Sequence, residues 1–144
     1  MEELFEALAQ AFADYRQDLD NYERKRRLTD GLLGFGRSLG DDSCHDRLDG
    51  RVRQIVSALC AAHPSPAEAE RALGMLLRDD MPAWPLAAQW MLRAIERHSL
   101  PLIPFLSPEA ADAFYQAYRR RYRPYDRLPA QREVCLALKA QSRT

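Results

Sequence analysis

Residues 81–106 read MPAWPLAAQWMLRAIERHSLPLIPFL, and this stretch decides how the chain folds. It is the most apolar part of the sequence and holds both tryptophans, Trp84 and Trp90. From Pro82 to Arg97 the apolar side chains cover more than one stripe of a helix, a pattern typical of a helix buried against several neighbours. We therefore predict a buried central helix over 82–97, in which each tryptophan needs packing and a partner for its indole N–H.

The prolines that follow predict a different local structure. Pro101 and Pro104 interrupt the apolar run Leu100–Leu106, and proline disfavours a continuing α-helix. We expect an extended or single-turn 3₁₀ strap that lies across the bundle. The side chains that it should bury are Leu102, Ile103 and Phe105.

Upstream, a long N-terminal helix is predicted from Glu2 to Arg27. Its apolar side chains recur at spacings of three and four, which marks one face of a helix: Phe5, Leu8, Phe12, Tyr15, Leu19 and Tyr22. Acids in the first turns and bases in the last suit the helix dipole. Such a helix is about 40 Å long and should overhang shorter neighbours. The apolar, glycine-rich segment 29–40 is expected to be broken or kinked and to fold back onto the core.

Four further helices are predicted, near 43–62, 65–78, 107–122 and 129–140. Ser65-Pro66-Ala67-Glu68 combines an N-cap serine, a proline at the first helical position and a glutamate for a capping box. No segment alternates apolar and polar residues as a strand would. The prediction is an all-α fold: one domain over 1–144, a bundle of five or six helices with a long N-terminal helix and a buried central helix.

Composition and charge limit the classes of protein to which this chain can belong. The formal net charge is zero, which argues against a surface built wholly for polyanions. The acidic N-terminus does not resemble an export signal, and no uncharged run approaches the roughly 20 residues that span a bilayer. We expect a cytoplasmic protein that has no membrane partner, requires no cofactor and keeps its three cysteines reduced.

Cysteine and histidine suggest a metal or hydrolytic site as one hypothesis. The candidate ligands are Cys44, His45, Cys60 and His63. If one helix carries both cysteines, they are about 24 Å apart, too far for one zinc ion. His45 and Asp49, one turn apart, could instead form a hydrogen-bonded pair of the kind that hydrolases use. The alternative is that these residues are core cysteines and helix-end histidines.

The C-terminal segment suggests nucleic-acid binding as a second hypothesis. Residues 113–144 hold eight basic and two acidic residues. Where arginines alternate with tyrosines, the arginines can bind phosphates and the tyrosine rings can stack on bases. The candidates are Arg119, Arg120, Arg121, Arg123 and Arg127. Helical spacing equally predicts that Tyr115, Tyr118 and Tyr122 belong to the core.

A non-catalytic interaction module is the function that we predict. The overhanging part of the first helix should need a cover, either the 29–40 segment or a protein partner such as a second copy. The candidate interface residues are Tyr15, Leu19, Tyr22, Leu32, Leu33 and Phe35. Exposure of Trp90 would instead make the central helix the better interface candidate.

Overall fold

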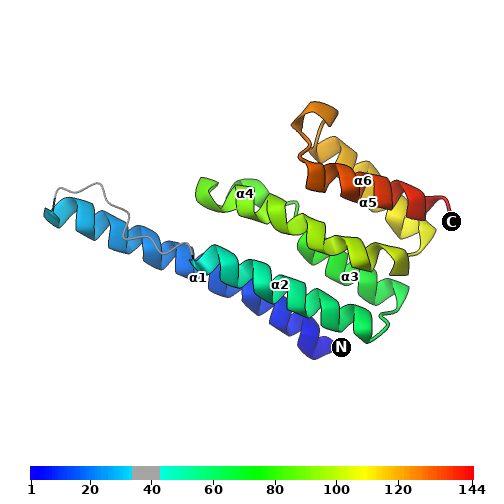
Figure 1. The fold of residues 1–144 in the computed structure, drawn as a ribbon, viewed down its shortest axis with the longest axis horizontal. Coiled ribbons are helices and arrows are strands. Elements are labelled where there is room, and N and C mark those ends of the chain that lie inside the picture. Colours follow the sequence, from blue (N-terminus) through cyan, green and yellow to red (C-terminus); the bar gives the residue numbers. More distant parts are fainter. Residues whose placement is uncertain (34–42) are drawn as a thin grey trace.

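The computed structural model describes residues 1–33 and 43–144, and all the regular secondary structure in these residues is helical (Figure 1). The α-helices are α1 (Glu2–Leu33), α2 (Ser43–Ala61), α3 (Pro66–Leu76), α4 (Leu86–Ile95), α5 (Pro108–Arg121) and α6 (Pro129–Ser142). The 3₁₀ helices are η1 (Met81–Ala83), η2 (Glu96–Phe105) and η3 (Pro124–Asp126). The predicted all-α fold with a long N-terminal helix is confirmed.

Three layers make up the bundle. The antiparallel pair α1 and α2 forms one side, α3 and the continuous α4–η2 segment lie in the middle, and the antiparallel pair α5 and α6 forms the other side (Figure 1). Within the described residues, no helix is long and apolar enough to cross a lipid bilayer.

The middle of the fold is η2, which packs against α2, α3, α4 and α6. In a 3₁₀ helix the side chains at i and i+3 lie above one another. Glu96, Ser99 and Leu102 follow this spacing and are buried, whereas Pro101 and Pro104 face outward. The predicted strap is therefore a ten-residue 3₁₀ helix rather than a single turn.

The side chains that the strap buries are largely those that the sequence predicted. Leu102 and Ile103 are fully buried, and Phe105 is half-buried against the core. The strap is thus part of the core, and its apolar side chains join the two outer layers.

The central helix α4 is shorter than predicted and is buried on one face only. Ala88, Leu92 and Ile95 point into the core, but Leu86 is 83% exposed and Trp90 is 56% exposed. The apolar pattern predicted burial on more than one face of this helix, which the exposure of Leu86 and Trp90 contradicts. It did not indicate that the described chain would provide a neighbour for only one of them.

Helix α1 continues to Leu33, about six residues beyond the predicted end at Arg27. Residues 29–33 therefore extend the helix instead of breaking it, because a single glycine such as Gly31 costs a helix only about 1 kcal/mol. The helix has 32 residues and is about 48 Å long. Its second half extends beyond the rest of the bundle, as expected (Figure 1).

Candidate functional site

The outward surface of η1 and α4 is entirely apolar at its exposed positions. We call this surface the α4 face, and its exposed residues are Pro82, Ala83, Leu86, Ala87 and Trp90. The sequence from 81 to 92 contains no charged residue. A surface helix normally carries polar side chains on its outer face, and a contiguous exposed apolar patch marks an interaction site.

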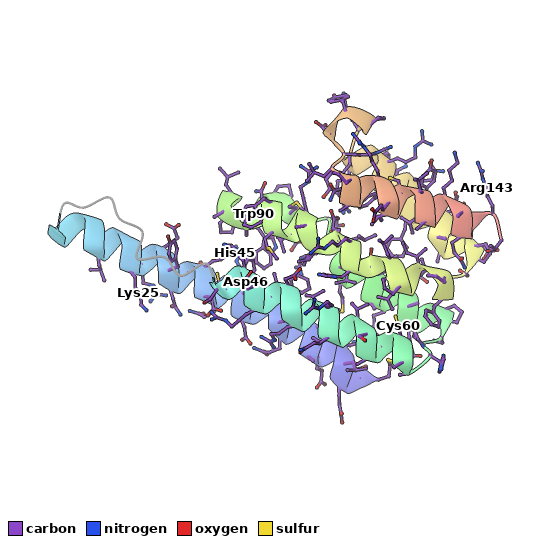
Figure 2. All side chains as sticks on the ribbon, viewed as in Figure 1. Lys25, His45, Asp46, Cys60, Trp90 and Arg143 are labelled. Carbon is purple, nitrogen blue, oxygen red and sulfur yellow. The ribbon has the colours of Figure 1, made fainter. Side chains whose placement is uncertain are left out.

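The inner edge of Trp90 is held by α2. The centroids of the Trp90 and His45 rings are 5.2 Å apart, and the two side chains lie beside each other in Figure 2. His45 Nδ1 lies 2.7 Å from the hydroxyl of Tyr15 on α1. Burial raises the pKa of Tyr15, so the phenol stays neutral in this hydrogen bond with His45. Trp90 is thus fixed on one side and open to solvent on the other.

Trp84 fixes the other end of the α4 face, and in contrast to Trp90 it is buried. Its indole Nε1 lies 3.4 Å from Asp80 Oδ2, which gives the indole a partner. The guanidinium groups of Arg16 and Arg78 lie 4.8 and 5.2 Å from the centre of its ring. Arg16 also donates a 3.1 Å hydrogen bond to the carbonyl of Ala83. These contacts hold η1 against α1, so the α4 face is a preformed surface.

Directly behind α4 lies a buried polar network centred on Glu96. Its Oε1 accepts hydrogen bonds from Tyr122 Oη at 2.9 Å, Gln131 Nε2 at 3.1 Å and Tyr118 Oη at 3.2 Å. No described residue forms a hydrogen bond with Oε2, and Arg121 Nη1 lies 4.0 Å from it. Burial raises the pKa of Glu96 to about 7, although these donors and Arg121 oppose the rise.

This network connects several helices of the fold to one another. Glu96 is fully buried, so its carboxyl group cannot meet a ligand while the fold is closed. Its hydrogen bonds connect η2 to α5 and α6, and Gln131 also donates to the carbonyl of Arg93 on α4. The network therefore sets the position of α4 and hence of its exposed face.

The four metal-ligand candidates are not brought together. Cys44 and Cys60 lie near opposite ends of α2, about 24 Å apart, and Figure 2 places Cys60 far from His45. His45 is bound to Tyr15, and His63 is exposed in the turn after α2. Within residues 1–33 and 43–144, no three His, Cys, Asp or Glu side chains are arranged to hold a metal ion.

The expected His45–Asp49 pair is replaced by another. Asp49 Oδ1 lies 2.7 Å from Nε2 of His98, which borders a cavity of about 370 Å³ that Cys60 also lines. Burial raises the pKa of Cys60, which leaves it a protonated and poor nucleophile. Sequence reasoning missed His98 because the two partners are 49 positions apart and have no local signal.

The arginine candidates make separate contacts within the chain. Arg121 turns inward and donates a 3.1 Å hydrogen bond to the carbonyl of Leu77. Arg123 contacts Tyr125, and Arg127 donates to the carbonyl of Tyr122. Arg119 lies over the ring of Tyr115, and Arg120 is exposed. Tyr118 and Tyr122 are buried, in accordance with the core interpretation, and are unable to stack on bases.

The interface candidates on α1 are largely accounted for within the chain. Tyr15 and Leu19 are buried, and Tyr22 is half-buried, so the fold itself covers this part of the helix. The side chains of Leu32 and Leu33, and all of Phe35, lie outside the described residues. An exposed apolar surface that these candidates did not include lies on α4.

Comparison of the chain with protein-family models, with curated proteins and with solved structures finds no match.

Proposed function

We propose that the protein is a non-catalytic self-associating module in which the α4 faces of two copies pack together about a two-fold axis. The observation that carries this proposal is the exposure of Leu86 and Trp90, one helical turn apart, on a surface without charge. Full burial of a large apolar side chain contributes roughly 1.5–3 kcal/mol. Two such side chains from each copy provide a substantial driving force for association.

The chemistry of the face supports a second copy as the occupant. A two-fold interface brings each surface patch against itself, so charged groups at its centre would repel their own copies. The α4 face has none between 81 and 92. Its large residues, Leu86 and Trp90, also lie beside the small residues Ala83 and Ala87. The ridge of one copy can therefore enter the groove of the other.

Sedimentation equilibrium from micromolar to millimolar concentration tests the proposal. The wild-type protein should approach the mass of two chains as the concentration rises. The double variant Leu86→Gln/Trp90→Gln should keep the mass of one chain, since it places amide groups on the face. The matched control Leu128→Gln/Leu136→Gln, which changes two exposed leucines outside the α4 face, should associate like the wild type.

Two outcomes would overturn self-association through the α4 face. The first is a wild-type mass of one chain at every concentration, which would leave the α4 face to a different protein. The second is equal association of the wild type and the α4 double variant, which would place the contact elsewhere. Circular dichroism of each variant verifies that the helical fold is retained.

A further inference from the structure

A groove between α5 and α6 is lined by three cations and by no carboxylate. Its lining residues are Tyr115 on α5, Arg127 before α6, and Arg132, Cys135, Leu136 and Lys139 on α6, around a volume of about 360 Å³. We propose that this groove is a binding site for a small phosphomonoester whose organic part is apolar or aromatic. The site is separate from the α4 face.

The positive charge of the groove is not neutralised within the described residues. Arg127 donates to the carbonyl of Tyr122, and neither Arg132 nor Lys139 forms an ion pair with a described side chain. Three acids of the N-terminal half form ion pairs with arginines of that half. The pairs are Arg47–Asp18, Arg51–Asp14 and Arg71–Glu2. The bases that line the groove therefore remain available to an external anion.

A fourth cation contributes to the field at the groove. The guanidinium of Arg119 lies 5.5 Å from the centre of the Tyr115 ring, which forms part of the lining. Burial raises the pKa of the Cys135 thiol, while the charges of Arg127 and Arg119 oppose this rise. Arg119 thus lies close enough to the groove for its charge to act on Cys135, one of the lining residues.

The number of cations favours phosphate over carboxylate. A phosphomonoester carries between one and two negative charges at neutral pH, with three acceptor oxygens, so it can engage several cations together. Arginine matches phosphate oxygens with paired N–H donors, and such charge-assisted hydrogen bonds are among the strongest. A carboxylate carries a single charge and would leave most of the positive groups uncompensated.

The remaining lining favours an organic ligand of small size. Leu136 is mostly exposed, and together with the half-buried Tyr115 it provides apolar surface beside the cations. Small-molecule sites have volumes of roughly 300–1,000 Å³, and this groove is at the lower end of that range. A nucleic-acid strand offers the same phosphate chemistry, but it binds best to a row of exposed aromatic rings. Tyr118 and Tyr122 are buried and cannot form such a row.

Isothermal titration calorimetry at low salt tests the proposal with four probes: phenyl phosphate, inorganic phosphate, benzyl alcohol and a single-stranded oligothymidylate. Phenyl phosphate should bind more tightly than inorganic phosphate, and benzyl alcohol should not bind. The variant Arg132→Gln/Lys139→Gln should weaken phenyl phosphate binding at least about tenfold, the effect of losing charge-assisted hydrogen bonds. The matched control Arg120→Gln/Arg143→Gln removes the same charge outside the lining and should have a much smaller effect.

Each contrary result has a definite meaning. Absence of phenyl phosphate binding, with or without binding of the oligothymidylate, would overturn the small-ligand site. Equal weakening by the two double variants would show that overall charge, rather than the groove, attracts the anion. Equal affinity for inorganic phosphate would overturn the organic part of the ligand. Thermal melts of both variants, with midpoints near that of the wild type, verify that they are folded.

Discussion

Glu96 connects the stability of the fold to pH. Burial raises the pKa of its carboxyl group to about 7 in the folded chain, compared with an ordinary glutamate pKa of 4.5. The folded state therefore binds more protons than the unfolded state between these pH values, and stability falls as pH rises through that window. Glu96 makes its full contribution to the free energy of unfolding below about pH 4.5. As the pH rises toward 7, that contribution falls by an amount on the order of 3 kcal/mol.

We predict that Glu96→Gln removes this pH dependence. Glutamine is neutral at every pH and keeps an oxygen that can accept hydrogen bonds from Tyr118 and Tyr122. Urea denaturation at pH 5, 6 and 7.5 should show a flatter free energy of unfolding in the variant than in the wild type. Glu70→Gln, at an exposed position on α3, should retain the wild-type slope. Parallel slopes for the wild type and Glu96→Gln would contradict the assignment.

The contact between Tyr15 and His45 gives a second prediction at the scale of one residue. Tyr15→Phe keeps the ring in the core but removes the hydroxyl that bonds His45 Nδ1. The free energy of unfolding should fall by about 1 kcal/mol, the usual net value of one hydrogen bond. Chemical denaturation at pH 7.5 measures this change. A stability equal to that of the wild type would mean that solvent satisfies His45 equally well.

Sequence alone could not identify these polar partners. Glu96 lies inside an apolar stretch without a local sign that it is buried, and its donors Tyr118, Tyr122 and Gln131 are between 22 and 35 positions away. The same holds for Asp49 and His98. Helical spacing predicts contacts within one element, whereas these pairings depend on how separate elements pack.

Helix starts, in contrast, could be read from the sequence. The predicted capping box of α3 is present: Ser65 Oγ accepts from the N–H of Glu68 at 3.2 Å, and the Glu68 side chain accepts from the N–H of Ser65 at 2.9 Å. Ser107 caps α5 in a similar way. These motifs are local, so few tertiary contacts can override them.

We predict that Ser65→Ala lowers the free energy of unfolding by about 1 kcal/mol, because an N–H at the start of α3 loses its acceptor. Ser57→Ala, at an exposed position inside α2, is the control and should leave stability unchanged or slightly higher, since alanine favours helices. Thermal denaturation compares the two variants. An equal effect of both would indicate that the cap does not contribute.

Helix ends and the 3₁₀ segment were less predictable at the same scale. The glycines after Arg27 suggested a break, yet α1 continues through Gly31 to Leu33. The prolines of residues 100–106 suggested an extended strap or a single 3₁₀ turn, but η2 keeps a three-residue repeat over ten residues because Pro101 and Pro104 fall on its outer side. Such outcomes depend on packing against the layers, which periodicity does not reveal.

Across the whole molecule, the free energy of unfolding should distinguish a leucine in the core from a leucine on the α4 face. Leu102→Ala, in the middle of η2, should lower the free energy of unfolding by about 2–5 kcal/mol, the range for a buried leucine. Leu86→Ala should change it by no more than about 0.5 kcal/mol in dilute solution, because that side chain is exposed. Urea denaturation at low protein concentration tests both. Similar losses for the two would show that Leu86 belongs to the core.

The sequence predicted the fold class and the apolar importance of residues 81–106, but it did not locate the candidate sites. Trp84 and Trp90 have similar sequence surroundings, yet one is buried and the other is exposed. Hydrophobicity indicates that a side chain favours burial and does not identify the chain that buries it. The groove between α5 and α6 likewise depends on how two helices align, although the excess of basic residues was visible in the sequence.

The central position of η2 has a consequence for synthesis on the ribosome. Helices α1 to α3 are made before η2, which therefore emerges with partners for only part of its surface. Gln131 lies 35 positions after Glu96, so the Glu96 carboxyl stays hydrated and Leu102 stays incompletely covered until α6 has been made. We therefore expect nascent chains that stop before α6 to be recognised by chaperones and proteases as unfinished.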